Sequence, residues 1–420
     1  MKEELLHYVW RTRGFDQSNL FSTEGDPIII LYQGKYNTNE GPDFLEAKVR
    51  IADKLWIGQI EIHIKSSDWL LHKHSYSNVI LHVVLEEDVP IYNSLNSRIP
   101  CLELRSHLSK KMLAHYVKLM NTTCWVPCES LLLSVSDFTK NIWMESLAIE
   151  RLQQRVDALK PILFKSKNDW ETLFFQLLSK SLGMKVNAEA MWQLAETMPL
   201  SILLKHKNQL LQLEALLFGQ AGMLSKAFID DYPGQLKKEY AFLRHKYDLH
   251  PMTGNEWRFL RLRPSNFPTI RIAQLAQLIH QTDRLFSKAM AACDKEEVRN
   301  MFEVTLSNYW YDHYVFDKLS KASFKRMGKL TIQNILLNTV IPLLFLYADQ
   351  KQDEALKKKA LFWLQDMKPE HNSIIRNWEN IGFQATSALQ TQALIQLKSQ
   401  YCDQQRCMNC RIGHEILSSK

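Results

Sequence analysis

Two short segments near the start of the chain carry the side chains with the clearest chemical potential. Residues 41–44 read Gly-Pro-Asp-Phe, and residues 59–65 read Gln-Ile-Glu-Ile-His-Ile-Lys. Alternation of polar and apolar residues predicts a β-strand, in which side chains two positions apart share a face. We therefore expect Glu61, His63 and Lys65 to project together, while the isoleucines between them pack into the core.

A carboxylate pair forms if residues 45–52 are the neighbouring antiparallel strand, as the turn-like residues 52–54 suggest. Asp43 then approaches Glu61 across the sheet, and the two carboxylates can share one Mg²⁺ or Mn²⁺ ion. His63 or Lys65 would position the attacking water, since an imidazole is an effective base near neutral pH. The alternative is an exposed sheet face without a catalytic role.

This arrangement resembles the PD-(D/E)XK phosphodiesterase superfamily. There, an Asp that opens one strand and an acidic residue on the next strand bind the metal, and a Lys two positions further on orients or activates the water. The resemblance implies that Asp43 and Glu61 are metal ligands. His63 occupies the Lys position, and Lys65 is the alternative holder of that role. Glu4 is a possible third carboxylate, although a solvated acid at a helix start is the simpler interpretation.

A group of histidines permits a competing interpretation. His63, His72, His74 and His82 lie close together in the sequence. Neutral imidazoles with a nearby carboxylate are ordinary zinc ligands, so the chain could be a zinc hydrolase. Alternatively, His82 is a hydrogen-bonded core residue, and the two histidines at 72 and 74 belong to a solvated loop.

The order of predicted elements indicates an α+β fold. An amphipathic helix over residues 2–13 is followed by strands over 26–32, 45–52, 59–65, 79–85 and 99–104. We expect a mixed sheet in a PD-(D/E)XK-like core, a large all-helical region after about residue 130, and a C-terminal cysteine cluster. The predicted domains are 1–129, 130–400 and 401–420, with the last packing back on the body.

Three of the seven cysteines lie within nine residues at the C-terminal end: Cys402, Cys407 and Cys410. Three thiols are one ligand short of a closed site, and Cys128 is the first candidate for the fourth, with His414 as the alternative. Such a site suits Zn²⁺ or a 4Fe-4S cluster. The organisation resembles iron-sulfur nucleases, in which cysteines staple the chain around a PD-(D/E)XK core. Free buried thiols are the plain alternative.

One segment of the helical region could contact nucleic acid. Residues 257–271 combine arginines, aromatic residues and two prolines. Guanidinium groups bind phosphates and aromatic rings stack on bases, so Arg261, Arg263 and Arg271 are candidate contacts. The structural alternative is a helix end and a rigid loop whose arginines pair locally.

Composition sets the frame for these hypotheses. The chain has 420 residues, 46% of them hydrophobic, and a formal net charge of +7. This charge is compatible with a nucleic-acid partner without requiring one. The longest apolar stretch, 335–348, is short for a membrane span, so we expect a cytosolic protein without a membrane partner.

Taken together, several motifs resemble an uncharacterised bacterial family known as a domain of unknown function. They are GPDF, EIH with SDW and H-x-H, R-x-RP-x-NFP and the terminal cysteines. Family membership of this kind imports no activity. The predicted site around Asp43 and Glu61 favours a metal-dependent nuclease acting on DNA or RNA. The alternatives are a catalytically inactive nucleic-acid-binding or scaffolding protein on a nuclease-like fold, and the zinc hydrolase.

Overall fold

The computed structural model describes residues 2–71, 78–282 and 284–419, and the chain divides into two compact units. Unit 1 comprises residues 1–147, 372–384 and 393–420, and unit 2 comprises residues 148–371 and 385–392. These bounds differ from the divisions predicted at 130 and 401. The first boundary falls inside one long helix, α3 (Asp137–Lys165), and the cysteine-rich C-terminal segment belongs to the same unit as the sheet.

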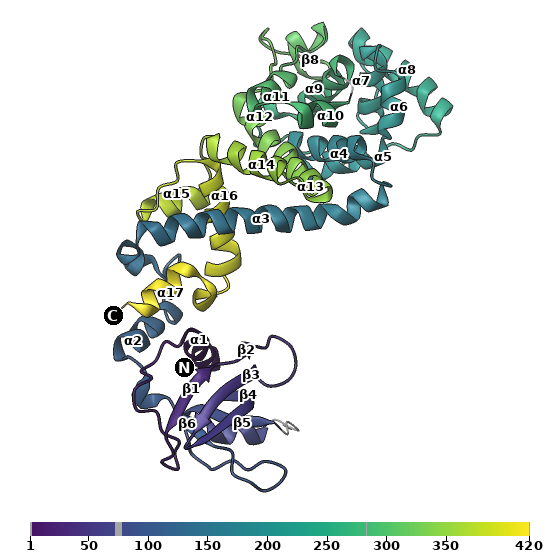
Figure 1. Cartoon of the computed structure of the whole chain (residues 1–420). Coiled ribbons are helices and arrows are strands. Elements are labelled where there is room, and N and C mark those ends of the chain that lie inside the picture. Colours follow the sequence, from purple (N-terminus) through teal and green to yellow (C-terminus); the bar gives the residue numbers. More distant parts are fainter. Residues whose placement is uncertain (1, 72–77, 283, 420) are drawn as a thin grey trace. The chain divides into compact units, whose positions relative to one another are not determined.

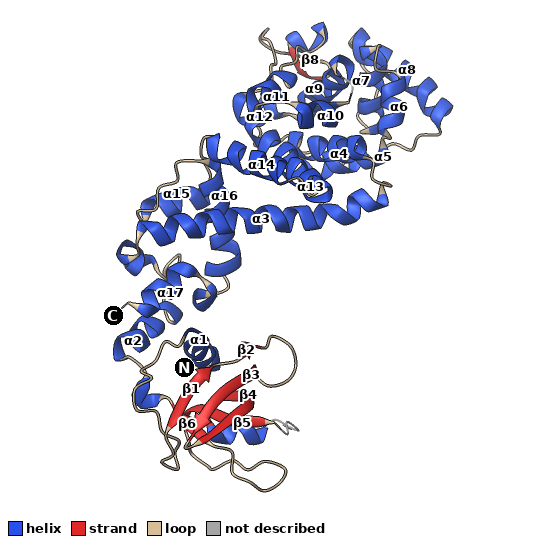
Figure 2. Ribbon diagram, viewed as in Figure 1, coloured by secondary structure: helices blue, strands red, loops and turns tan. Residues whose placement is uncertain are grey.

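Unit 1 contains a mixed sheet (Figures 1 and 2) with strand order β1-β3-β4-β5-β6 and with β2 pairing to β3. Strand β3 runs antiparallel to its neighbours β1 and β4, whereas β5 runs parallel to β4 and β6 parallel to β5. The strands are β1 (Ile28–Tyr32), β2 (Lys35–Tyr36), β3 (Phe44–Ile51), β4 (Lys54–Lys65), β5 (Val79–Glu86) and β6 (Cys101–Glu103).

The β3–β4 hairpin sets the register of the site. Ile51 pairs with Lys54, which leaves a two-residue turn in which Ala52 takes a left-handed φ of 49°. At the other end of the hairpin Phe44 pairs with Ile60, so Asp43 lies next to Glu61. The parallel β4–β5 pair needs a crossover, because the end of β4 and the start of β5 lie at opposite ends of the two neighbouring strands. The 3₁₀ helix η1 (Ser66–Leu71) forms its first part.

Helix α1 (Glu3–Thr12) packs against β4 with the apolar face that its sequence periodicity predicts. Leu5, Leu6, Val9 and Trp10 on that face are fully buried. This packing covers one face of the sheet with a second layer, which is the usual way for a sheet to bury its apolar side chains. The residues of α1 that face the sheet are therefore in position to join a site on β3 and β4.

The rest of unit 1 is helical. Helix α17 (Arg411–Ser418) contacts α2 (Lys110–Met120) and the two 3₁₀ helices η3 (Glu129–Ser134) and η8 (Cys407–Asn409). Gly413 permits this packing, because a Cβ atom there would lie 2.0 Å from the carbonyl oxygen of Cys407. Helix α15 (Ser373–Asn380) and the π-helix η7 (Leu397–Cys402) complete the unit.

Unit 2 is almost entirely helical, so the α+β class and the large helical region are confirmed; helices make up 55% of the whole chain. A two-stranded ribbon of β7 (His313–Val315) and β8 (Lys318–Leu319) is added to it. Its helices are α4 (Trp170–Leu182), α5 (Ala188–Thr197), α6 (Leu200–Lys205), α7 (Leu210–Gln220), α8 (Asp231–Tyr247), α9 (Pro268–Gln281), α10 (Leu285–Ala291), α11 (Lys295–Met301), α12 (Lys329–Ile335), α13 (Ile341–Lys351) and α14 (Glu354–Asp366). Helix α16 (Ala388–Gln396) crosses the last unit boundary, between residues 392 and 393.

One helical stretch, Lys329–Lys351, is long and apolar enough to cross a membrane; it is the only one within the described residues. It consists of α12, the π-helix η6 (Leu336–Val340) and α13. Within this stretch, 72% of the most apolar window is buried inside the structure. Burial of this extent is what a core helix of a water-exposed domain shows as well.

Candidate active site

Two carboxylates, those of Asp43 and Glu61, meet where β3 and β4 pair. The Asp43 Oδ2 atom accepts a hydrogen bond of 2.8 Å from the backbone N–H of Ile62. The Glu61 carboxylate in turn accepts from the backbone N–H of Asp43. Each acidic side chain thus accepts a hydrogen bond from the backbone beside the other, and these two bonds tie the pair together.

Glu61 is an unusual carboxyl group because it is buried, with only 5% of the residue exposed. Burial, followed by the negative charge of Asp43, raises the pKa of Glu61 to about 8. Both causes penalise the ionised form: a low dielectric disfavours any charge, and a second anion nearby repels it. At neutral pH without a cation, the protonated form of Glu61 is therefore favoured.

Helix α1 contributes a histidine to the same place. His7 Nε2 lies 3.4 Å from Asp43 Oδ1 and 3.6 Å from Glu3 Oε1. Burial by itself lowers the pKa of His7, but the hydrogen bond and charge of Asp43 outweigh it, and the pKa is raised overall. The sequence analysis missed His7. The available signal was the i, i+4 spacing of Glu3 and His7, which puts both on one face of the helix.

The acid that α1 turns toward the carboxylate pair is Glu3 and not the predicted Glu4. The charge of Glu3 acts on both His7 and Glu61 and raises the pKa of each. Glu4 is exposed. One position along a helix rotates a side chain by roughly 100°, and this separates the two glutamates.

His63 lies in the interior, bonded to a second histidine. Its Nδ1 atom is 2.9 Å from Nε2 of His82, and the Trp69 ring packs edge-on against both imidazoles. His63 is 4% exposed and His82 is fully buried. One of the two nitrogens must donate the proton and the other accept it, which makes the pair a proton-sharing unit inside the sheet.

Glu61, His63 and Lys65 alternate along β4 and so share a face, as expected, but their exposure differs. Glu61 and His63 lie under the layer formed by α1 and η1, whereas Lys65 is exposed at the end of β4. The backbone N–H of Lys65 donates to Asp68 at 3.0 Å. Within the described part of the chain, the Lys65 ammonium interacts with neither carboxylate.

The described side chains give no support to a zinc site formed by His63, His72, His74 and His82. His72 and His74 lie outside the described residues. In the described ranges, no group of three or more His, Cys, Asp or Glu side chains is spaced to hold a metal ion. Asp43 and Glu61 still suit Mg²⁺ or Mn²⁺, because these ions are commonly bound by one or two protein carboxylates together with water and substrate phosphates.

The cysteines form a second notable group in unit 1. Burial raises the pKa of Cys128 to about 12, and the neighbouring Cys410 and Cys407 raise it further. Burial also raises the pKa of Cys402, with added contributions from the same three thiols. All four sulfurs therefore lie in one neighbourhood, although not in a ready-made metal cage. His414 points elsewhere, with Nδ1 2.6 Å from the Tyr8 hydroxyl.

The three arginines of the predicted nucleic-acid segment differ in exposure. Arg261 and Arg263 are exposed. Arg271 is only 3% exposed and donates to Gln274, Asn266 and Thr331 at 2.7 to 2.8 Å. This corrects the assignment of Arg271, because a buried guanidinium whose two terminal amino groups are engaged inside the protein cannot reach a phosphate.

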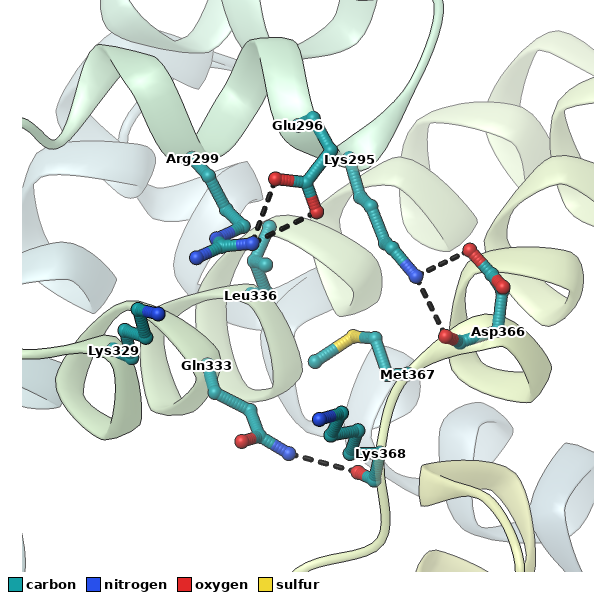
Figure 3. A pocket seen from close by; sticks show the side chains of 9 residues that line it. All are labelled: Lys295, Glu296, Arg299, Lys329, Gln333, Leu336, Asp366, Met367 and Lys368. Atoms are coloured by element: carbon teal, nitrogen blue, oxygen red, sulfur yellow. Dashed lines mark hydrogen bonds and ion pairs between the residues drawn. The ribbon is translucent and has the colours of Figure 1, made fainter.

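A cavity of about 280 Å³ in unit 2 also gathers cations (Figure 3). Asp366 pairs with Lys295, and Glu296 holds Arg299 through two contacts, the shorter 2.7 Å. Lys329 and Lys368 line the same cavity, and neither has an ion pair with any described residue. The arrangement can attract an anion, but it contains no pair of adjacent carboxylates that could hold a catalytic metal.

The fold and the site define an α+β protein with a carboxylate pair, one member of which is buried, at a mixed sheet, and with a large helical region. The chain belongs to the family described as "Protein of unknown function (DUF2851)", whose model matches residues 3–373. No curated protein and no solved structure matches the chain.

Proposed function

We propose that this protein is a metal-dependent phosphodiesterase that cleaves nucleic acid, with Asp43 and Glu61 as metal ligands. The observation that carries the proposal is the carboxylate pair itself, held together where β3 and β4 pair, with the pKa of Glu61 raised by burial and by Asp43. A divalent cation would replace the proton of Glu61, lower the pKa of a bound water and neutralise charge on the phosphate. Structural carboxylates rarely adopt so costly an arrangement.

The topology supports a relation to the PD-(D/E)XK phosphodiesterases. Along the chain, α1 is followed by the antiparallel strands β1, β3 and β4, a crossover, and the parallel strand β5. Asp43 directly precedes β3 and Glu61 lies on β4, which is where the superfamily pattern places its two metal-binding acids. His63 stands two positions further on, where that pattern has a Lys.

Two histidines have roles in this proposal. His7 is the positioning residue for Asp43, because its Nε2 atom approaches Oδ1 while the backbone holds Oδ2. Protonated His7 would place a positive charge beside the Asp43 carboxylate. His63, backed by His82, is the group that would accept or orient the proton of the attacking water. Lys65 is the alternative for this step, although it lies exposed beyond the buried pair.

A catalytically inactive protein that binds or organises nucleic acid is the second candidate. The observation that favours it is the engagement of His63 with His82 at the position where the superfamily has a free Lys. A protein of this class would keep its affinity for nucleic acid and show no metal-dependent cleavage.

We also propose that Cys128, Cys402, Cys407 and Cys410 hold Zn²⁺ or a 4Fe-4S cluster. The support is their shared location and the electrostatic cost that their thiolates impose on one another, which a cation would relieve. Burial raises the pKa of Cys410, and hydrogen bonds from the backbone N–H groups of Gly413 and Ile412 offset only part of that rise. All seven cysteines are free thiols, which fits a reducing cytosol and a nucleic-acid partner there.

Cleavage assays test the proposed function. Purified protein is incubated with labelled single- and double-stranded DNA and RNA in Mn²⁺, Mg²⁺ or EDTA. We expect cleavage of at least one substrate with metal and none with EDTA, and we expect Asp43→Asn to reduce the rate more than about 100-fold, since losing a ligand exceeds the effect of outer-shell changes. Asp53→Asn, in the exposed β3–β4 turn, is the matched control. Equal rates for the wild type and Asp43→Asn would remove the catalytic assignment.

A further inference from the structure

A cavity of about 380 Å³ adjoins the candidate active site within unit 1. One wall is α1, and the facing wall is formed by residues 404–406, 408 and 409 of the cysteine-rich segment. His7 lines the cavity with one side of its ring, while its Nε2 atom lies 3.4 Å from Asp43 Oδ1. A molecule in this cavity would therefore touch the residue that positions the carboxylate pair.

The charges of the cavity favour an anion. Lys2, Arg11 and Arg406 line it together with a single acid, Glu4. In the part of the chain that the structure describes, none of the three cations is in an ion pair. Two guanidinium groups and one ammonium group without ion pairs face one carboxylate, so the cavity walls carry a net positive charge.

Aromatic rings hold the two guanidinium groups in place. The Arg11 Cζ atom lies 5.4 Å from the centre of the Tyr36 ring, and that of Arg406 lies 5.2 Å from the centre of the Tyr401 ring. Cation–π contacts of this kind leave the N–H groups at the guanidinium edge available for a phosphate. The one side-chain partner of Arg11 is Asn409 Oδ1, at a long 3.4 Å.

The remaining lining suits an unpaired base. Tyr36, which also contacts Arg11 and Phe44, is 40% exposed and lines the cavity, and the amides of Gln404, Gln405 and Asn409 offer both donors and acceptors. Proteins that hold single strands combine the same elements, namely cations that follow the backbone and aromatic rings on which bases stack. A base inside a duplex is stacked and paired, and it would have to leave the helix to enter a cavity of this size.

We propose that this cavity seats one nucleotide of a single-stranded nucleic acid, with Arg11 and Arg406 on its phosphates and Tyr36 against its base. The inference rests on the proposed phosphodiesterase function and names the form of its substrate. It also gives the cysteine-rich segment a purpose, because Cys402, Cys407 and Cys410 bracket the residues that form the second wall.

Binding measured without cleavage tests this inference. Fluorescence anisotropy in EDTA compares single-stranded DNA and RNA with hairpin duplexes of the same sequence, for the full chain and for Arg11→Gln with Arg406→Gln. We expect tighter binding of single strands than of duplexes. The double variant should lose at least tenfold in affinity and lower the slope of log K against log salt by about 1.4, at about 0.7 per phosphate contact.

The matched control is Lys48→Gln with Arg50→Gln, which removes the same charge from exposed positions on β3. If the Arg11 and Arg406 variant melts at a lower temperature than the wild type, Lys2→Gln, at an exposed helix end, replaces it. Equal affinity for single strands and duplexes, or an equal loss in the control variant, overturns the inference. Because binding is scored without metal, a failure here leaves metal-dependent cleavage standing, and an absence of cleavage leaves this result standing.

Discussion

Two buried carboxyl groups, Glu61 in unit 1 and Glu214 in unit 2, both have a raised pKa. Their neighbours differ, and so do the roles that we infer for them. Glu61 is 5% exposed and Glu214 is fully buried. Burial is the first cause for both, and it raises the pKa of Glu61 to about 8 and that of Glu214 to about 7. By burial and pKa alone, each would be a candidate for a functional site.

The neighbours of the two groups separate them. Glu214 accepts from the Tyr232 hydroxyl at 2.6 Å, the Trp310 indole at 3.2 Å and the Ser307 hydroxyl at 3.3 Å. These donors lower the pKa and satisfy the carboxyl group, so Glu214 ties α7 to its surroundings. For Glu61 the next cause after burial is a second carboxylate, which raises the pKa further. A costly group beside a like charge indicates function, and one surrounded by donors indicates structure.

The largest effect on stability is expected at Glu214. In Glu214→Gln the amide NH₂ replaces one acceptor oxygen and faces hydroxyl and indole donors, so buried donors lose their partners. We expect a loss of about 3 kcal/mol in the free energy of unfolding, measured by urea denaturation. Glu61→Gln should cost far less in the same experiment, since the neutral amide resembles the protonated carboxyl group that the raised pKa of Glu61 favours. Equal losses in the two variants would contradict the distinction between the two groups.

The cysteine cluster gives the next largest expected effect. Replacing Cys407 with Ser removes a proposed ligand and should lower the melting temperature and abolish bound metal, with a loss of about 2 kcal/mol, typical of a lost buried anchor. Cys293→Ser, at an exposed position, is the control and should change neither quantity. Metal analysis and absorption spectra of anaerobically purified protein distinguish zinc from iron and sulfur. A metal-free protein whose stability is unaffected by Cys407→Ser would defeat the proposal.

The pH dependence of stability gives the smallest expected effect over one pH unit. The pKa of Glu61 is higher in the folded chain than in the unfolded chain, so the folded state binds more protons between these two values. The stability contributed by this proton is complete below the unfolded pKa and is lost as the pH rises toward about 8. Wild type should therefore lose stability relative to Glu61→Gln on raising the pH without metal, on the order of 1 kcal/mol per pH unit. Parallel stability curves for the two proteins would show that Glu61 titrates normally.

The local sequence pattern was sufficient to predict the β3–β4 hairpin. It was insufficient to predict which other parts of the chain pack on the hairpin. Alternation over residues 59–65 and the turn at Ala52 predict β3 and β4 well, because both follow from strand geometry. Alternation cannot tell whether a polar face is later covered. Helix α1 and Trp69 cover the polar face of β4, and neither belongs to the alternating segment 59–65. This packing buries Glu61 and His63.

The same limit explains His7. Its helix is readable from the spacing of Leu5, Leu6, Val9 and Trp10, but its approach to Asp43 depends on how that helix docks on the sheet. The cavity beside it is also beyond sequence reasoning, since its walls come from the two ends of the chain. Long-range packing decides these features, and no local propensity encodes them.

Calorimetric titration of Mn²⁺ tests the central claim most directly. At pH 7, in buffers with different ionisation enthalpies, binding to the wild type should release about one proton per metal ion, because Glu61 must lose its proton to become a ligand. Glu61→Gln should bind weakly and release none, and Glu214→Gln should behave as the wild type. Absence of Mn²⁺ binding to the wild type, or binding without proton release, would contradict the assignment of Asp43 and Glu61 as a metal site.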